Sequence, residues 1–301
     1  MHNNNKFINR FLIYQKERFP VVVLLFTTLS VVLSSYAISS TFVVVTNAPL
    51  KIFLGLMSAI ICLFHTRVID EHRDFNHDSQ HHKYRPVQRG LISRKELKYI
   101  DYIGLFIFMC VALFYGTYTL IFGLIVIIFS FIASKDFFLG EIIRKRFLIY
   151  NAVNLIQTIL LQAFVYSIFI NWWYDFSILW LHLVFVLSNS TLIEFIRKIK
   201  IKEEESTGRD TYSWHFGFKK SLWIYKLLII INYSLFLLTM KLQHILTILT
   251  FTISIIFVIL LLGSALRHLR LKDKSSERIL LLNTLILYIG LHLMVYFSIK
   301  F

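Results

Sequence analysis

Long apolar runs separated by short polar segments make up most of the chain. Nine such windows lie at about residues 20–42, 49–69, 100–117, 119–134, 147–170, 176–196, 221–240, 243–264 and 279–299. A bilayer core is about 30 Å thick and takes roughly 20 helical residues to cross, so these runs are of spanning length. They lack the apolar–polar alternation of transmembrane β-strands. The pattern predicts an all-α integral membrane protein. It would be one polytopic domain over residues 1–301, with a bundle of about nine transmembrane helices within 19–299.

Composition and charge add an orientation to this picture. Hydrophobic residues make up 57% of the chain and the mean hydropathy is +0.66, above the range of soluble domains. The net charge of +15 would suit a nucleic-acid partner, but nine spans put 29 of the 32 Lys and Arg residues on one side. By the positive-inside rule that side is cytoplasmic, which predicts an internal N-terminus and an external C-terminus. The expected partner is therefore the lipid bilayer and not nucleic acid.

The acids gather on the same side as the bases. Of the 17 Asp and Glu residues, only Asp175 falls on the other side. Two long connections, at residues 70–99 and 197–220, hold most of them. Long ordered loops in a compact protein are usually functional. We therefore expect two acidic loops that cap the cytoplasmic side, where the chemistry would lie.

The first acidic loop opens with a regular row of carboxylates. Asp70, Asp74 and Asp78 are spaced i, i+4 and i+8, so they share one face if the preceding helix continues. Like charges at this spacing repel unless a cation compensates them. Carboxylates are ligands for hard cations such as Mg²⁺, which also keeps phosphate oxygens in its shell. The alternative is a solvated loop in which Arg73, Lys83 and Arg85 pair with the acids.

The residues after this row carry a resemblance to a known family. The stretch from Asp70 to Ser93 resembles the first signature of the UbiA superfamily of intramembrane prenyltransferases: Asn-Asp-x-x-Asp-x-x-x-Asp, then Arg-Pro and Gly-x-(Ile/Val)-Ser. Asp70 stands in place of the Asn and Glu71 in place of the first Asp. The matching residues are Asp74, Asp78, Arg85, Pro86, Gly90, Ile92 and Ser93. The nine-span layout and the places of both loops are also similar.

The second signature of that family, an Asp-x-x-Asp-x-x-x-Asp stretch after the sixth span, is altered here. Glu194 fills its first place, but Arg197 and Ile201 occupy the next two. An acidic run, Glu203 to Glu205, follows. Because guanidinium has no acceptor atom, Arg197 cannot ligate a metal. Either it contacts a diphosphate directly, or it pairs with a nearby Glu. A solvated acidic loop is the third interpretation.

The resemblance implies a UbiA-like bundle with an active cavity on the cytoplasmic side. Its activity would be Mg²⁺-dependent ionisation of an allylic prenyl diphosphate, with transfer of the prenyl group to a hydrophobic aromatic or lipid acceptor. Asp74 and Asp78 would be catalytic. The implied metal ligands are Asp70, Glu71, Asp74, Asp78, Glu194 and Glu204, and the implied diphosphate-binding residues are Lys83, Arg85, Lys145, Arg146, Arg197 and Lys198.

Polar residues inside the fifth window are candidates for the prenyl or acceptor cavity. Asn151, Asn154 and Gln157 recur at i, i+3 and i+6. Polar side chains within a span face the bundle interior, where they line a substrate path or join helices by hydrogen bonds. Both interpretations remain open at this point.

Three other functions compete. An intramembrane terpene cyclase of class I type and a non-enzymatic membrane protein would both keep the scaffold. The motif His77-x-x-x-His81-His82 resembles a histidine box of membrane di-iron enzymes. Such enzymes need several boxes, and the remaining histidines, among them His182 and His292, look isolated.

Overall fold

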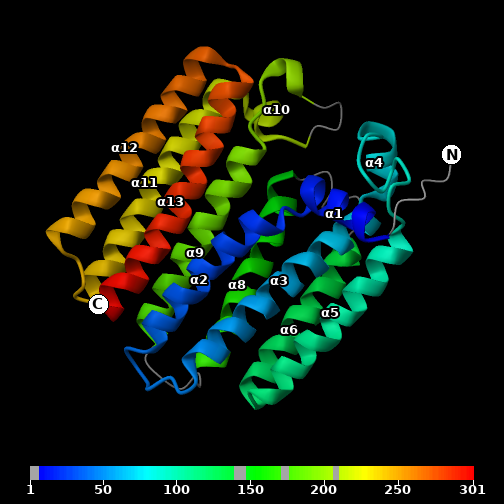
Figure 1. The fold of residues 1–301 in the computed structure, drawn as a ribbon. Helices are drawn as coiled ribbons and strands as arrows, with labels where there is room; N and C mark the ends of the chain where they lie inside the picture. Colours follow the sequence, from blue (N-terminus) through cyan, green and yellow to red (C-terminus); the bar gives the residue numbers. More distant parts are fainter. Residues whose placement is uncertain (1–6, 139–146, 171–175, 206–209) are drawn as a thin grey trace.

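The structure is all-helical wherever it is described. The computed structural model describes residues 7–138, 147–170, 176–205 and 210–301, which form helices and connecting turns without a strand (Figure 1). The long helices are α2 (Val21–Ser39), α3 (Ala48–Arg73), α5 (Arg94–Phe114), α6 (Thr117–Ser134), α8 (Phe147–Phe169), α9 (Phe176–Arg197), α11 (Phe218–Leu242), α12 (Ile248–Leu271) and α13 (Lys274–Lys300).

Eight of these helices, counted over the described residues, are long and apolar enough to cross a membrane. The ninth expected span falls on α8, in which the apolar stretch Leu155–Phe169 is shorter than the others. The prediction of an all-α integral membrane bundle is confirmed. The count of nine and the cavity expected on the cytoplasmic side stay predictions.

Several helices begin before the apolar windows that predict them. Helix α5 begins at Arg94 because Ser93 and Glu96 form a capping box, in which each side chain accepts from the other residue's backbone N–H. Helix α13 begins at Lys274, after the box of Asp273 and Ser276. The caps satisfy backbone N–H groups that have no partner within the helix. The first turns of α5 and α13 can therefore form in the polar sequence that precedes each apolar window.

The bundle is arranged as three groups of helices. Figure 1 shows α11, α12 and α13 on one side and α3, α5 and α6 on the other, with α2, α8 and α9 between them. Helix α2 packs against α13, α3 against α5, α6 against α8, and α9 against α11. The first and last long helices are therefore neighbours, although they lie at opposite ends of the sequence.

Small residues allow close helix contacts in the bundle. A Cβ atom placed on Gly123 of α6 would lie 3.1 Å from the Cβ of Ala112 on α5. One placed on Gly290 of α13 would lie 2.4 Å from the ring of Phe257 on α12. Since lipid tails are as apolar as the side chains, such close packing is a main source of helix association in membranes.

The polar segments gather at one end of the bundle, called here the cap end. Helices α1 (Phe7–Arg18), α4 (Phe75–His81), η2 (Lys202–Glu204) and α10 (Tyr212–Phe216) lie there, and the C-terminus lies at the opposite end (Figure 1). Helix α1 folds back over the end of α3. Its Tyr14 is fully buried, and the rings of Phe11 and Phe19 contact Phe64 edge-on.

Candidate active site

The row of three aspartates predicted from their spacing forms in the structure. Helix α3 passes into α4 with only a local break at Asp74, and the helical hydrogen bonds continue. The N–H of Asp74 donates to the carbonyl of Asp70 (2.9 Å), that of Asp78 to Asp74 (2.9 Å), and that of His82 to Asp78 (2.8 Å). Asp70, Asp74 and Asp78 therefore lie one turn apart along one face of a nearly continuous helix, and His82 follows as the C-cap residue of α4.

Arginines compensate the charges of the row. Arg73 lies 2.6 Å from Asp70 and 3.1 Å from Asp74, and Arg85 pairs with Asp78. The side chains of Asp70 and Asp74 are 29% and 33% exposed, whereas that of Asp78 is 5% exposed. Asp70 and Asp74 thus keep open oxygen atoms, while Asp78 is enclosed by its partners.

Glu71 lies beside this row and shares its arginine partners with Asp70 and Asp78. It follows Asp70 by one residue, a rotation of about 100° around a helix. Its fully buried carboxylate accepts from Arg18 Nε of α1 (3.0 Å) and from Arg67 of α3 (2.9 Å). The structure therefore uses Glu71 to hold α1 against α3. A metal-binding role for Glu71 stays a prediction.

The end of α9 faces the end of α3. Glu194 is an electrostatic neighbour of Asp70. It pairs with Lys198 (2.7 Å) and with Arg197 (3.5 Å), and Lys198 also donates to the side-chain oxygen of Asn151 on α8. Candidate residues of the first signature, such as Asp70, and of the altered second signature, such as Glu194, thus both lie at the cap end.

The acidic run after α9 has other partners. Glu204 lies 3.0 Å from Lys274 at the start of α13, and this hydrogen bond lowers the pKa of the Glu204 carboxyl. Glu205 accepts a hydrogen bond from Thr211. These contacts tie the run to the start of α13 and to Thr211, the N-cap residue of α10. Metal binding by Glu204 stays a prediction.

The other candidate residues occupy varied positions. Lys83 is exposed in the turn after α4. Gln157 is buried and donates to Ser130 on α6 (2.9 Å), with Cys62 on α3 at 3.6 Å, which favours the helix-joining interpretation of that residue. Lys145, Arg146 and the side chain of Asn154 lie outside the described residues.

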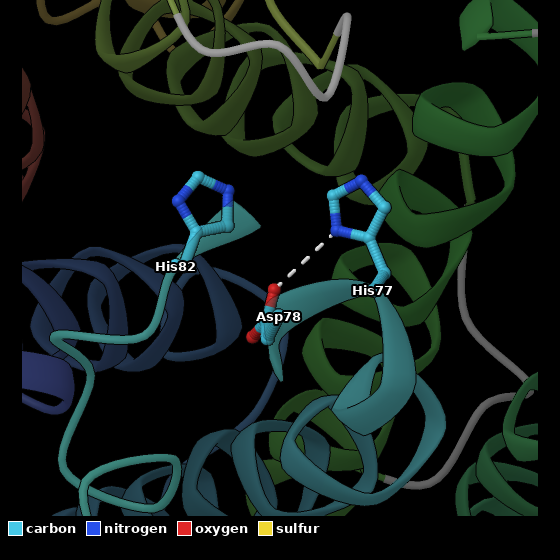
Figure 2. A group of neighbouring side chains, drawn as sticks. All are labelled: His77, Asp78 and His82. Atoms are coloured by element: carbon cyan, nitrogen blue, oxygen red, sulfur yellow. Dashed lines mark ion pairs between the residues drawn. The ribbon is translucent and has the colours of Figure 1, made fainter. Parts of the chain in front are cut away.

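Two histidines of the aspartate loop approach the row. Ligand atoms of His77, Asp78 and His82 all lie within 4.8 Å of one another (Figure 2). Nε2 of His82 lies 3.5 Å from Oδ2 of Asp210, so the two cap segments meet here. Burial, with nearby Arg85, lowers the pKa of His82. Sequence reasoning assigned His77 and His82 to a weak histidine box. The sequence analysis did not group these histidines with Asp78. Their spacing could have indicated the group, because His77 directly precedes Asp78 and His82 follows it by four residues.

The expectation that His182 and His292 are isolated is wrong. Ser34 on α2 joins them, with its hydroxyl oxygen 3.1 Å from His182 Nε2 and 3.0 Å from His292 Nδ1. Tyr166 lies 2.7 Å from the other nitrogen of His182, and Asn189 3.2 Å from that of His292. The group is fully buried, in the half of the bundle away from the cap end. It links α2, α8, α9 and α13 by hydrogen bonds.

Fold and site together define a helical-bundle membrane protein with a centre of carboxylates, arginines and a lysine at one end. The chain belongs to the UbiA prenyltransferase family, whose model matches residues 23–289. No curated protein matches the chain.

Solved structures share the fold over nearly the whole chain. A structure described as that of digeranylgeranylglyceryl phosphate synthase has 19% identity and a TM-score of 0.61, covering 97% of this chain and 100% of its own. An apo UbiA homologue from Aeropyrum pernix K1 has 16% identity and a TM-score of 0.60, covering 89% and 97%. A UbiA homologue from Archaeoglobus fulgidus, bound to DMAPP and Mg²⁺, has 18% identity and a TM-score of 0.58, covering 95% and 99%.

Proposed function

We propose that the protein is a Mg²⁺-dependent intramembrane prenyltransferase, which ionises an allylic prenyl diphosphate and transfers the prenyl group to an aromatic or lipid acceptor. The observation that carries the proposal is the row of Asp70, Asp74 and Asp78, with Glu194 as an electrostatic neighbour of Asp70. Family membership supports it, as do Archaeoglobus fulgidus homologues with this fold that bind DMAPP and Mg²⁺ or GPP and Mg²⁺.

The donor atoms at the cap end fit Mg²⁺. They are carboxylate oxygens, and Mg²⁺ takes one or two carboxylates together with substrate phosphate oxygens. Asp70 and Asp74 are partly exposed, and Glu194 is an electrostatic neighbour of Asp70 from the second signature. The bound ion would neutralise negative charge that develops on the leaving diphosphate.

The chain's own cations would bind and orient the diphosphate. In the structure Arg73 and Arg85 pair with the acids. A guanidinium group can form two parallel hydrogen bonds to a phosphate group, just as it does to a carboxylate. Lys198 lies between Glu194 and Asn151, where it adds a fixed positive charge. We propose that this charge replaces part of the metal binding that the altered second signature lacks.

The reaction follows from these placements. The bond between the allylic carbon and the diphosphate oxygen breaks, and its electron pair leaves with the diphosphate. The apolar bundle shields the allylic cation from water. An electron pair of the acceptor then forms the new bond to carbon, and the acceptor loses a proton. We also propose that the cap end faces the cytoplasm, because most Lys and Arg residues fall on that side when nine spans are counted.

Pyrophosphate release from purified protein tests the proposal. With DMAPP or GPP, an acceptor-containing membrane extract and Mg²⁺, Asp74→Asn should lower the rate by about 10²–10³-fold, the usual loss when a charge-stabilising group is removed. The matched control is Glu203→Gln, an exposed acid in the other cap segment, which should stay within about two-fold.

Three outcomes would contradict the proposal. Tight binding of labelled prenyl diphosphate in EDTA would exclude a metal bridge. Release that needs no extract, with a cyclic product, would favour the terpene cyclase on the same scaffold. If the Asp74→Asn protein is as active as the Glu203→Gln protein, the aspartate row is not part of the active site.

A further inference from the structure

The three side chains drawn in Figure 2 form a cluster of nitrogen and oxygen donors beside the aspartate row. His77 and Asp78 belong to α4, and His82 follows its last turn. One donor atom from each lies within 4.8 Å of the other two, and Nδ1 of His77 lies 3.6 Å from Oδ1 of Asp78. No other such group of three occurs among the described residues.

The carboxylate of Asp78 divides its two oxygens between different partners. Oδ2 pairs with Arg85 and lies 4.0 Å from Arg18. Oδ1 is the atom turned toward His77. The arginines therefore fix the carboxylate plane and leave one oxygen for the cluster. Partners that orient a carboxylate in this way are a regular part of protein metal sites.

His82 provides an independent observation that points to a ligand. Its side chain is nearly fully buried, and Nε2 makes no hydrogen bond within the described part of the chain. Its contact with Asp210, at 3.5 Å, is longer than a normal hydrogen bond. A buried polar atom without a partner is costly, so the ring has an unmet need for a cation or a donor nearby.

We propose that His77, Asp78 and His82 form a second cation site that takes a borderline transition-metal ion, with Zn²⁺ the best suited. Two imidazoles and one carboxylate match the preference of Zn²⁺, whereas Mg²⁺ prefers oxygen ligands. Asp210 reaches the same ring from the second cap segment.

The cluster needs only a small contraction to bind the ion. Ligands about 2.1 Å from a tetrahedral ion are roughly 3.4 Å apart, against the present limit of 4.8 Å. Asp78 and His82 are held by burial, while the side chain of His77 is 40% exposed.

The two cation sites would share Asp78. This consequence rests on the proposed function, in which Asp78 belongs to the Mg²⁺-diphosphate site. An ion held by the imidazoles and Oδ1 of Asp78 draws that carboxylate away from the diphosphate centre. Zn²⁺ would therefore inhibit the Mg²⁺-dependent reaction, and loss of the imidazoles would relieve the inhibition.

Metal titration without any prenyl substrate tests the site itself. Metal-free protein in detergent is titrated with Zn²⁺ by calorimetry, and Co²⁺ is used as a spectroscopic probe. We expect one ion per chain and visible Co²⁺ bands that Zn²⁺ abolishes. His77→Gln and His82→Gln should each raise Kd at least about ten-fold. The matched control is His81→Gln, the exposed neighbour on the same helix, which should leave Kd within two-fold.

The results test the Zn²⁺ site separately from the proposed prenyltransferase function. No Zn²⁺ binding by the wild type at millimolar concentration, or equal affinity in His82→Gln, overturns the site whatever the enzyme does. If His82→Gln does not fold, His77→Gln decides, because its side chain is partly exposed. Zn²⁺ binding without prenyltransferase activity would retain the site and reject the proposed function.

Discussion

Glu71 offers a direct choice between two roles, because the family resemblance makes it a metal ligand and the structure makes it a link between helices. The change to test is Glu71→Gln, which keeps the shape and removes the charge. The carboxylate accepts from Arg18 of α1 at 3.0 Å and from Arg67 of α3 at 2.9 Å. Only the first contact crosses between helices, so α1 should loosen while α3 stays in place.

The expected size of the effect follows from these contacts. A hydrogen bond to a charged group contributes about 1.5–3 kcal/mol, and Gln retains a neutral acceptor. Asp78, 4.0 Å from Arg18, is a second partner that reduces the loss. We therefore expect local opening of α1 to become easier by about 1–2 kcal/mol, which is roughly 5- to 30-fold in the open population.

Limited trypsin cleavage at Arg18 in detergent measures that opening. Cleavage of Glu71→Gln should be faster by the same factor, with Mg²⁺-dependent binding of labelled prenyl diphosphate unchanged. Glu17→Gln is the matched control, since it breaks the exposed pair with Arg89 and such surface pairs contribute little. Unchanged cleavage combined with loss of Mg²⁺-dependent binding would refute the reasoning and make Glu71 a ligand.

Three further changes test other parts of the structure. In the pyrophosphate assay, Arg197→Ala should raise KM and lower kcat more than the triple change of Glu203, Glu204 and Glu205 to Gln. The reason is that Arg197 lies beside Glu194, whereas the glutamate triplet is tied to α13 and α10. A larger loss from the triple change would instead place the metal on the triplet. Ser34→Ala should destabilise the folded bundle by about 1–2 kcal/mol in detergent unfolding, since two buried interhelical hydrogen bonds are lost, whereas Ser234→Ala on an exposed face should not. Reporter fusions after residues 85 and 301 should report the cytoplasm and the outside respectively; a cytoplasmic C-terminus would reject the charge-based orientation.

Features set by helical periodicity were predictable from the sequence. The aspartate row needed only the knowledge that α3 continues past residue 70, and the repeat of four residues indicated it. The apolar windows located the spans for the same reason. The early start of α5 was also readable, because Ser93 followed by Glu96 is a capping-box pattern.

Contacts between distant segments were not predictable in this way. The pairing of Glu71 with Arg18 depends on α1 folding back across α3, and no spacing in the sequence encodes that return. His182 and His292 are 110 positions apart by their numbers and meet only because α9 and α13 are neighbours in space. The turning of Glu204 toward Lys274 likewise depends on the position of α13.

The contact between α2 and α13 bears on how the chain is assembled during synthesis. Helix α2 is made first among the long helices and α13 last, yet they pack side by side. Until α13 enters the bilayer, Ser34 and His182 lack His292, and one flank of α2 faces lipid. Each helix is stable in lipid on its own because its backbone hydrogen bonds are internal. Insertion and closure of the bundle are therefore separate events. A chain in which α13 has not yet been inserted would lie in the membrane with an open polar seam along α2 and α9.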